Sequence, residues 1–256
     1  MKAVVMAYSE MGCVGLEALI RNGAEICAVF THTDNPSEQQ WFRSVAELAA
    51  RNDIPVFAPE DVNHPLWVEK IASYSPDFIF SFYYKNLLSD SILSIPKKGA
   101  LNLHGSLLPK YRGRVPINWA IINGETKTGI TTFFLDHDID TGKIIMQREF
   151  PIPDDADVEY VYDGLMHLGA QVCLDTVDMI ISGNITSISQ PKCDDLKAAP
   201  KIFKETCEID WNNSAKKIYD FIRGLSPVPG AWTKLYKNAE EEKRQEEERQ
   251  KEEKRR

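Results

Sequence analysis

The feature that most constrains this chain is the alternation of short apolar runs with helix-like segments over its first 125 residues. Short apolar runs predict buried strands, and apolar residues at helical spacing predict the helices between them. Strands are expected at Lys2–Tyr8, Glu25–His32, Pro55–Ala58, Asp77–Tyr84 and Gly99–Gly105, and helices at Met11–Asn22, Phe42–Asn52 and His64–Ser73. This order predicts an α/β fold with a mostly parallel sheet and helices on both faces. Ligands of such sheets bind outside the carboxyl ends of the strands, so chemistry is expected there.

The remainder of the chain follows a different pattern. Strands are expected at Thr131–Leu135, Lys143–Phe150 and Cys207–Trp211, helices at Val158–Ile181 and Ser214–Gly224, and a turn at Pro227–Gly230. We therefore expect a Rossmann-like domain over residues 1–190 and a partial C-terminal subdomain over residues 201–236. Residues 237–256 form a charged tail that has no apolar side chain from Glu240 onward, so a solvated helix or a disordered extension is expected.

Charge and cysteine content exclude several classes of protein. The net charge of −8 has the wrong sign for a broad surface that binds nucleic-acid phosphates. The five cysteines are odd in number and form no C-x-x-C pair, which is typical of reduced thiols and not of a disulfide framework or a zinc site. No uninterrupted apolar run approaches the roughly 18 residues of a membrane span, and the N-terminus lacks a cleavage-site pattern. A soluble, cytoplasmic protein without a membrane partner is expected.

The first strand–helix turn contains two glycines, Gly12 and Gly15, at the start of a predicted helix. Glycines in this position can cradle a phosphate at a helix N-terminus. The turn lacks the first glycine of the G-x-G-x-x-G fingerprint, and Glu10 adds a negative charge to it. We therefore interpret the glycines as positions where a helix packs closely on its strand, with a nucleotide site as the weaker alternative.

Three carboxylates at alternate positions, Asp136, Asp138 and Asp140, resemble the opening of a calcium-binding EF-hand loop. That loop requires glycine at its sixth position and glutamate at its twelfth, where this chain has Thr141 and Gln147. Strands and not helices are predicted on either side. No metal site is expected, and so many carboxylates in one turn imply that some of them have partners.

The end of the fifth predicted strand carries a carboxamide and an imidazole. Side chains alternate along a strand, so Asn102 and His104 are expected to share one face. A single strand histidine is more often structural, but its pairing with a carboxamide at a strand end favours a functional role. Lys110, Arg112 and Arg114 follow on a loop that is either a solvated basic turn or a site for an anionic ligand.

These residues belong to a longer pattern. The run NLHGSLLPKYRGRVPINW, followed by the DIDTG turn and IIMQ, resembles the signature of 10-formyltetrahydrofolate-dependent formyltransferases. That family includes methionyl-tRNA formyltransferase, glycinamide ribonucleotide transformylase and enzymes that formylate 4-amino sugars on nucleotides. The resemblance implies the α/β formyltransferase fold and formyl transfer to a primary amine.

The resemblance also implies roles for individual residues, of which Asn102, His104 and Asp140 correspond to the family's catalytic residues. Histidine titrates near neutral pH, so His104 would accept the proton of the attacking amine and return it to the folate nitrogen. Asn102 would donate to the developing oxyanion, and Asp140 would favour the charged imidazole. The co-substrate 10-formyltetrahydrofolate, with no metal, is expected to contact Asn86, Leu87, Leu88, Arg114, Asp136, His137, Asp138, Ile139 and Asp140.

The two halves of the chain resemble different members of the family. Residues 1 to about 120 are similar to the formyltransferase domain of the bifunctional polymyxin-resistance enzyme, which acts on UDP-4-amino-4-deoxy-L-arabinose in lipid A modification and antibiotic resistance. Residues from about 126 onward are similar to methionyl-tRNA formyltransferases, but most of their C-terminal barrel-like domain has no counterpart here. The chain is thus a divergent natural member, a chimera or a truncated form.

The acceptor is predicted from the charge of the loop that follows the second predicted strand. Residues 33–40 occupy the position of a basic loop in tRNA-specific members, yet they contain two acidic residues and no basic one. UDP-4-amino-4-deoxy-L-arabinose is therefore the expected acceptor, with its diphosphate near Lys110 and Arg112, and methionyl-tRNA is the alternative. Two other hypotheses remain: a non-catalytic module that binds folate or a nucleotide, and hydrolysis of the formyl co-substrate.

Overall fold

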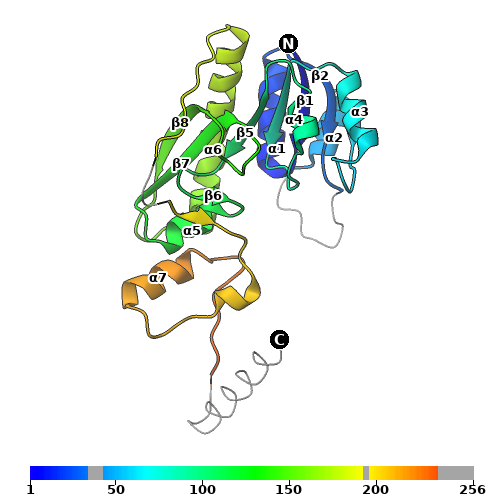
Figure 1. The fold of residues 1–256 in the computed structure, drawn as a ribbon. Coiled ribbons are helices and arrows are strands. Elements are labelled where there is room, and N and C mark those ends of the chain that lie inside the picture. The colour runs from blue at the N-terminus through cyan, green and yellow to red at the C-terminus, as the bar shows by residue number, and fades with distance from the viewer. Residues whose placement is uncertain (34–42, 193–195, 236–256) are drawn as a thin grey trace.

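A seven-stranded sheet in the order β3-β2-β1-β4-β5-β7-β8 forms the centre of the molecule (Figure 1). The computed structural model describes residues 1–33, 43–192 and 196–235. The strands are β1 (Lys2–Ala7), β2 (Glu25–Phe30), β3 (Val56–Phe57), β4 (Phe78–Phe82), β5 (Ala100–His104), β7 (Lys127–Phe134) and β8 (Ile144–Pro151). The first five run parallel, whereas β7 and β8 are antiparallel to their neighbours. The mostly parallel sheet expected from the sequence is confirmed.

Helices cover both faces of this sheet, as the sequence predicts. They are α1 (Ser9–Arg21), α2 (Val45–Arg51), α3 (Pro65–Ser73), α4 (Asp90–Leu93), α5 (Pro116–Ile122), α6 (Val158–Ile181) and α7 (Ala215–Arg223). The alternation of β1 divides the core, because Val5 packs in the cluster with α1, α2 and α6 while Val4 packs with α3 and α4. Part of the helix predicted at Phe42–Asn52 lies outside the described residues, and its described part is α2.

The longest helix, α6, combines 24 residues with enough apolar character to meet the length and composition of a membrane span. The sequence prediction considered only uninterrupted apolar runs and overlooked it. In the structure α6 packs against α1, β7 and β8, and its side chains Val161, Leu165, Val172 and Val177 are buried there. Its position is that of a core helix of the α/β domain.

The glycines of the first strand–helix turn serve close packing. A Cβ atom on Gly15 would lie 2.5 Å from the ring of Phe82, and one on Gly12 would lie 2.9 Å from Val45. Both distances are shorter than any ordinary carbon–carbon contact, so α1 approaches β4 and α2 only because these residues lack side chains. The packing interpretation of the turn is confirmed.

The strand predicted at Cys207–Trp211 is wrong. A 3-10 helix covers Lys204–Cys207, and a single bridge then joins Glu208 to Trp232. Two backbone hydrogen bonds to Trp232 are all the pairing present there, because the chain turns away at Asp210, whose carboxylate accepts from the backbone N–H of Asn212. Apolar alternation alone does not make a strand where no second strand lies alongside.

The described part of the C-terminal subdomain, residues 201–235, docks on the α/β domain through α7 (Figure 1). Asn118 on α5 donates its side-chain amide to the carbonyl of Gly224 at 2.9 Å. Arg223 donates to the carbonyl of Ala156 at 2.8 Å and pairs with the buried Asp220. The charged tail lies outside the described residues.

Candidate active site

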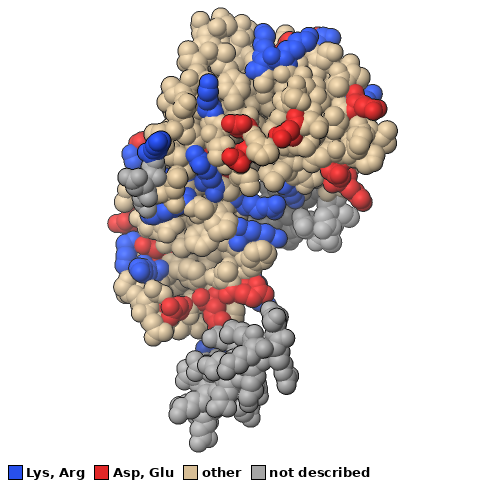
Figure 2. Space-filling view, viewed as in Figure 1, with Lys and Arg blue, Asp and Glu red and all other residues tan. Residues whose placement is uncertain are grey.

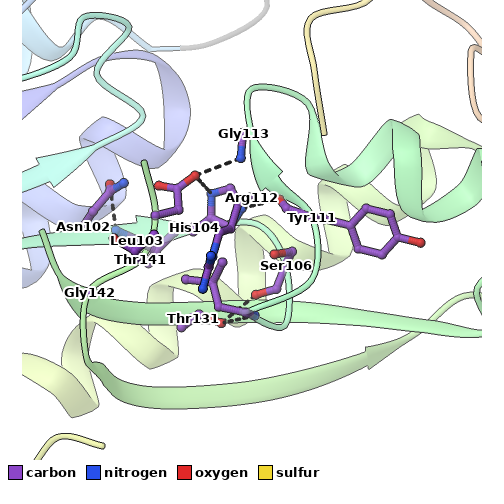
Figure 3. A network of polar contacts seen from close by, with 12 residues as sticks. Asn102, Leu103, His104, Ser106, Tyr111, Arg112, Gly113, Thr131, Thr141 and Gly142 are labelled. Atoms are coloured by element: carbon purple, nitrogen blue, oxygen red, sulfur yellow. Dashed lines mark hydrogen bonds and ion pairs between the residues drawn. The ribbon is translucent and has the colours of Figure 1, made fainter. Parts of the chain in front are cut away.

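Strand β5 brings a polar pair to the carboxyl edge of the sheet. Leu101 and Leu103 point into the core beside α6, so Asn102 and His104 project from the opposite face (Figure 3). On that face α3 and α4 pack against β1 and β2. Helix α6 packs on the opposite face, against β7 and β8. The sequence expectation that Asn102 and His104 share a face is met.

His104 is 6% exposed, and each of its ring nitrogens faces an oxygen atom. Its Nε2 lies 2.8 Å from the carbonyl oxygen of Tyr111. A carbonyl only accepts, so Nε2 carries the proton and the neutral ring keeps its lone pair on Nδ1. Nδ1 lies 3.7 Å from Oδ2 of Asp140. The atom able to accept a proton is therefore the one beside the carboxylate.

Asp140 lies in the turn between β7 and β8, where its backbone adopts a left-handed conformation with φ of 54°. Its Oδ2 accepts the backbone N–H of Gly113 at 2.9 Å, and its side chain is 10% exposed. Gly142 closes the turn, where any side chain would collide with the carbonyl of Phe134. The carboxylate is thus a fixed, partly desolvated charge beside the imidazole.

The loop after β5 is fixed by one threonine hydroxyl. Thr131 donates through Oγ1 to the carbonyl of Ser106 at 2.6 Å and accepts the N–H of Leu108 at 3.2 Å. Gln147 donates to the same oxygen at 2.9 Å and to the carbonyl of Leu108 at 2.8 Å. This network holds the loop that ends at Tyr111, whose carbonyl sets the tautomer of the His104 imidazole.

Asn102 is oriented by its own backbone. Its Oδ1 accepts the N–H of Leu103 at 2.9 Å, which leaves the Nδ2 amide group as the outward donor. In the described part of the chain no acceptor lies within hydrogen-bond distance of that Nδ2. A donor with unused hydrogens beside the imidazole is suited to an oxyanion.

The segment predicted to contact folate follows β4, the strand next to β5. Asn86 donates to the carbonyl of Glu60 at 3.3 Å, Leu88 packs into the core beside α3, and Leu87 is 65% exposed. Because β4 and β5 are parallel neighbours, this segment lies at the same edge of the sheet as Asn102 and His104.

Two residues that the sequence interpretation missed hold this segment in place. Asn63 donates to the carbonyl of Leu87 at 2.9 Å and accepts the N–H of Ser89 at 2.8 Å. His32 accepts the N–H of Lys85 through Nε2 at 3.0 Å, and burial together with the Lys85 charge lowers the pKa of His32. A neutral imidazole is what this acceptor role requires. His32 ends a predicted strand, which is the only signal that marked it.

The other predicted folate contacts are exposed. His137 projects from the turn with 76% of its side chain exposed, and a hydrogen bond and ion pair with Asp90 raise its pKa. Asp136 and Asp138 flank it, Ile139 is 54% exposed, and Arg114 is exposed after the short strand β6 (Arg112–Gly113). The structure thus brings Asn102, His104 and Asp140 together. Of the remaining predicted contacts, Asn86 and Leu88 are partly buried, and the others are exposed.

The basic side chains of the loop that follows β5 are not all available to an anion. Arg112 donates to Oε1 of Gln190 through Nε at 3.2 Å and through Nη2 at 2.6 Å. Gln190 lies far along the chain, and no sequence pattern marked it. The guanidinium expected to hold a diphosphate is therefore engaged within the protein on two of its nitrogens.

Neither thiols nor metal ligands gather in the described residues. Cys13, Cys27, Cys173 and Cys207 form no disulfide bond with one another, and Cys193 lies outside the described residues. Residues 1–33, 43–192 and 196–235 contain no group of three or more His, Cys, Asp or Glu that could hold a metal ion.

Comparison with known proteins finds matches over most of the chain. Residues 2–177 match the family model "Formyl transferase", and residues 201–251 match the model of the formyl transferase C-terminal domain. The solved N-formyltransferase from Helicobacter canadensis, in complex with folinic acid and dTDP-3-aminofucose, is 21% identical with a TM-score of 0.70, over 88% of this chain and 80% of that one.

Two further solved structures share the fold. A 4-N formyltransferase from Francisella tularensis is 20% identical with a TM-score of 0.70, over 91% of each chain. The phosphoribosylglycinamide formyltransferase from Bacillus halodurans is 24% identical with a TM-score of 0.61, over 71% of this chain and 96% of that one.

Proposed function

Because the chain belongs to the formyl transferase family of enzymes, we propose that it transfers a formyl group from 10-formyltetrahydrofolate to the amine of a sugar nucleotide, specifically UDP-4-amino-4-deoxy-L-arabinose. One observation carries the proposal: His104 presents the lone pair of Nδ1 beside the Asp140 carboxylate, on the same strand as the unused amide of Asn102.

The first step is attack of the sugar amine on the formyl carbon. A carbon–nitrogen bond forms, and the electron pair of the carbonyl moves to the formyl oxygen. Nδ2 of Asn102 donates to that oxygen as its negative charge develops. Since Oδ1 is tied to the backbone, the amide enters this step already oriented.

The second step is proton transfer and loss of the folate. Nδ1 of His104 accepts the proton of the attacking nitrogen, and the resulting imidazolium then has both N–H groups engaged, one with Tyr111 and one with Asp140. The same proton passes to N10 of the folate as its bond to the formyl carbon breaks. The products are the formylated amine and tetrahydrofolate.

Two exposed apolar side chains support the position of the folate. Leu87 after β4 and Ile139 in the β7–β8 turn flank the edge that carries the catalytic pair. Apolar surface of this kind suits the flat ring of a pterin, and the Helicobacter canadensis enzyme was solved with folinic acid.

The choice of acceptor rests on charge and on the relatives. The net charge is −8, and acidic and basic side chains occur in separate small groups on the face shown in Figure 2. The Helicobacter canadensis structure contains dTDP-3-aminofucose, an amino sugar on a nucleotide. With UDP-4-amino-4-deoxy-L-arabinose as acceptor, the reaction would belong to cytoplasmic lipid A modification in antibiotic resistance. The match of residues 201–251 to the C-terminal domain model keeps methionyl-tRNA as the second candidate.

A side-by-side assay tests the acceptor. The protein is incubated with 10-formyltetrahydrofolate and either UDP-4-amino-4-deoxy-L-arabinose, its N-acetylated form as a blocked control, or methionyl-tRNA. Mass spectrometry is expected to show a formylated free-amine sugar and no change in the blocked one. Formylation of methionyl-tRNA with none of the sugar contradicts the proposal. A thermal shift with 5-formyltetrahydrofolate but no product from any acceptor supports the non-catalytic binding module.

A further inference from the structure

Gln190 lies between the two parts of the chain that match family models, residues 2–177 and 201–251. Its amide Nε2 donates to the carbonyl of Asp140 at 2.7 Å and to the carbonyl of Gly142 at 2.9 Å. Its Oε1 accepts two bonds from the guanidinium of Arg112. One side chain therefore joins the catalytic turn to strand β6.

The backbone on both sides of Gln190 is anchored independently. Two residues earlier, Ile188 exchanges both backbone hydrogen bonds with Ile144 on β8, at 2.8 and 2.9 Å. Further along, β9 (Ala198–Ala199) pairs in parallel with β6. The described backbone is thus anchored both before and after Gln190, and the Gln190 side chain is half-buried where it meets the turn.

The turn needs such external bonds. Asp140 has a left-handed backbone, which is unfavourable for a residue with a Cβ atom, although aspartate tolerates it better than most. The two bonds from Gln190 bracket Thr141 and hold the carbonyls on either side of it. Through Arg112 the same side chain also fixes β6, whose Gly113 N–H binds the Asp140 carboxylate.

We propose that Gln190 is a positioning residue, which sets the place of the Asp140 carboxylate beside His104 by clamping the β7–β8 turn to β6. It touches neither the imidazole nor the carboxylate and acts only through the turn and Arg112. This inference rests on the proposed function for its kinetic consequences, but the geometry it describes can be measured without turnover.

Two substitutions separate the donor side of the clamp from the acceptor side. Gln190→Met keeps the length and removes all four bonds, whereas Gln190→Glu keeps the acceptor for Arg112 and loses both donors to the turn. If donation to the turn matters, both variants are expected to lower kcat about 10-fold or more, because misplacement by about 1 Å has costs of that order. Gln171→Met, the same change at an exposed position of α6, is the matched control.

A double-mutant cycle distinguishes action through Asp140 from a general loss of structure. In an Asp140→Asn background the carboxylate charge is already absent, so Gln190→Met is expected to cost less than about 2-fold further. A full loss in both backgrounds overturns the inference. Retention of wild-type kcat by Gln190→Glu also overturns it, because then only the bond to Arg112 counts.

The amide proton of Gly113 gives a readout that does not depend on activity. Its NMR resonance reports the bond to Oδ2 of Asp140, and Asp140→Ala marks the position of the broken bond. Gln190→Met, or Gln190→Glu if the first variant is unfolded by circular dichroism, is expected to move the resonance toward that position while Gln171→Met leaves it in place. An unmoved resonance overturns the inference, whereas absent turnover in the wild type with a moved resonance overturns only the proposed function.

Discussion

The β7–β8 turn has two halves that differ in almost every physical respect. His137 in the first half is 76% exposed in its side chain and pairs with the similarly exposed Asp90. Asp140, three residues later, is 10% exposed and is bonded to Gly113. A run of similar carboxylates therefore contains one fixed charge and several solvated ones, and the difference is made by distant parts of the chain.

In a charged turn, a carboxylate that the fold holds in place is better suited to a function than one in solvent. An exposed ion pair contributes little, because water and salt screen both partners. A carboxylate bound by a backbone amide at the edge of a sheet keeps its position and its field on the imidazole. Substitutions in the two halves should therefore differ strongly in effect.

The largest effect is expected at His104, the residue beside the fixed carboxylate of Asp140. Replacing His104 by Ala removes the proton acceptor and should lower kcat about 100-fold or more. Steady-state formylation of the amino sugar at saturating co-substrate measures it. A variant that retains a third of wild-type kcat would remove His104 from the mechanism.

Asp140→Asn is expected to have the second largest effect, and it tests the half of the β7–β8 turn whose carboxylate is fixed. The amide can still accept the N–H of Gly113, so the turn should keep its shape while the imidazolium loses its charge partner. We expect kcat to fall on the order of 10-fold to 100-fold with little change in KM. An equal loss from Asp136→Asn would erase the distinction between the halves.

Thr131→Val tests the network that supports Tyr111 and hence His104. The substitution preserves shape but leaves the Leu108 N–H and the Ser106 carbonyl without their partner, and it removes one of the two acceptors of the Gln147 amide. The free energy of unfolding should therefore fall by about 2 kcal/mol. Thr128→Val on the same strand is the control, because the buried hydroxyl of Thr128 has no partner among the described residues. Urea denaturation measures both, and equal losses would refute this role of Thr131.

The smallest effect is expected in the exposed half. Asp90 raises the pKa of His137 in the folded protein. Any stability from this pair is therefore fully present below the pKa that His137 has in the unfolded chain, and it is lost as the pH rises through the pKa of His137 in the folded protein. His137→Asn should therefore lower Tm slightly at pH 5.5 and leave it unchanged at pH 8.5. The same loss at both pH values would show that the charge of His137 is irrelevant.

The sequence predicted those features that depend on local pattern. Apolar runs located the strands, and strand alternation placed Asn102 and His104 on one face. The clamp of Gln190 was not predictable, because it depends on the path of a segment 50 residues beyond Asp140 that pairs through an isolated bridge. The tautomer of His104 was equally hidden, since its partner is the backbone carbonyl of Tyr111 and not a side chain.

The error at Cys207–Trp211 has the same origin. A strand exists only where a neighbour pairs with it, and residue types do not show that Trp232 supplies one bridge and no more. Local patterns therefore located the edge of the sheet where the site lies, and tertiary contacts determined which groups at that edge are fixed.

The central claim is that the formyl group reaches a sugar amine, and following the formyl carbon tests it most directly. The protein is incubated with tetrahydrofolate carrying a ¹³C-labelled 10-formyl group and with UDP-4-amino-4-deoxy-L-arabinose, and the label is observed by ¹³C NMR. We expect the label in a formamide on the sugar, and no such signal with the His104→Ala protein in the same time. Label found only in free formate, or left on the folate, would contradict the account.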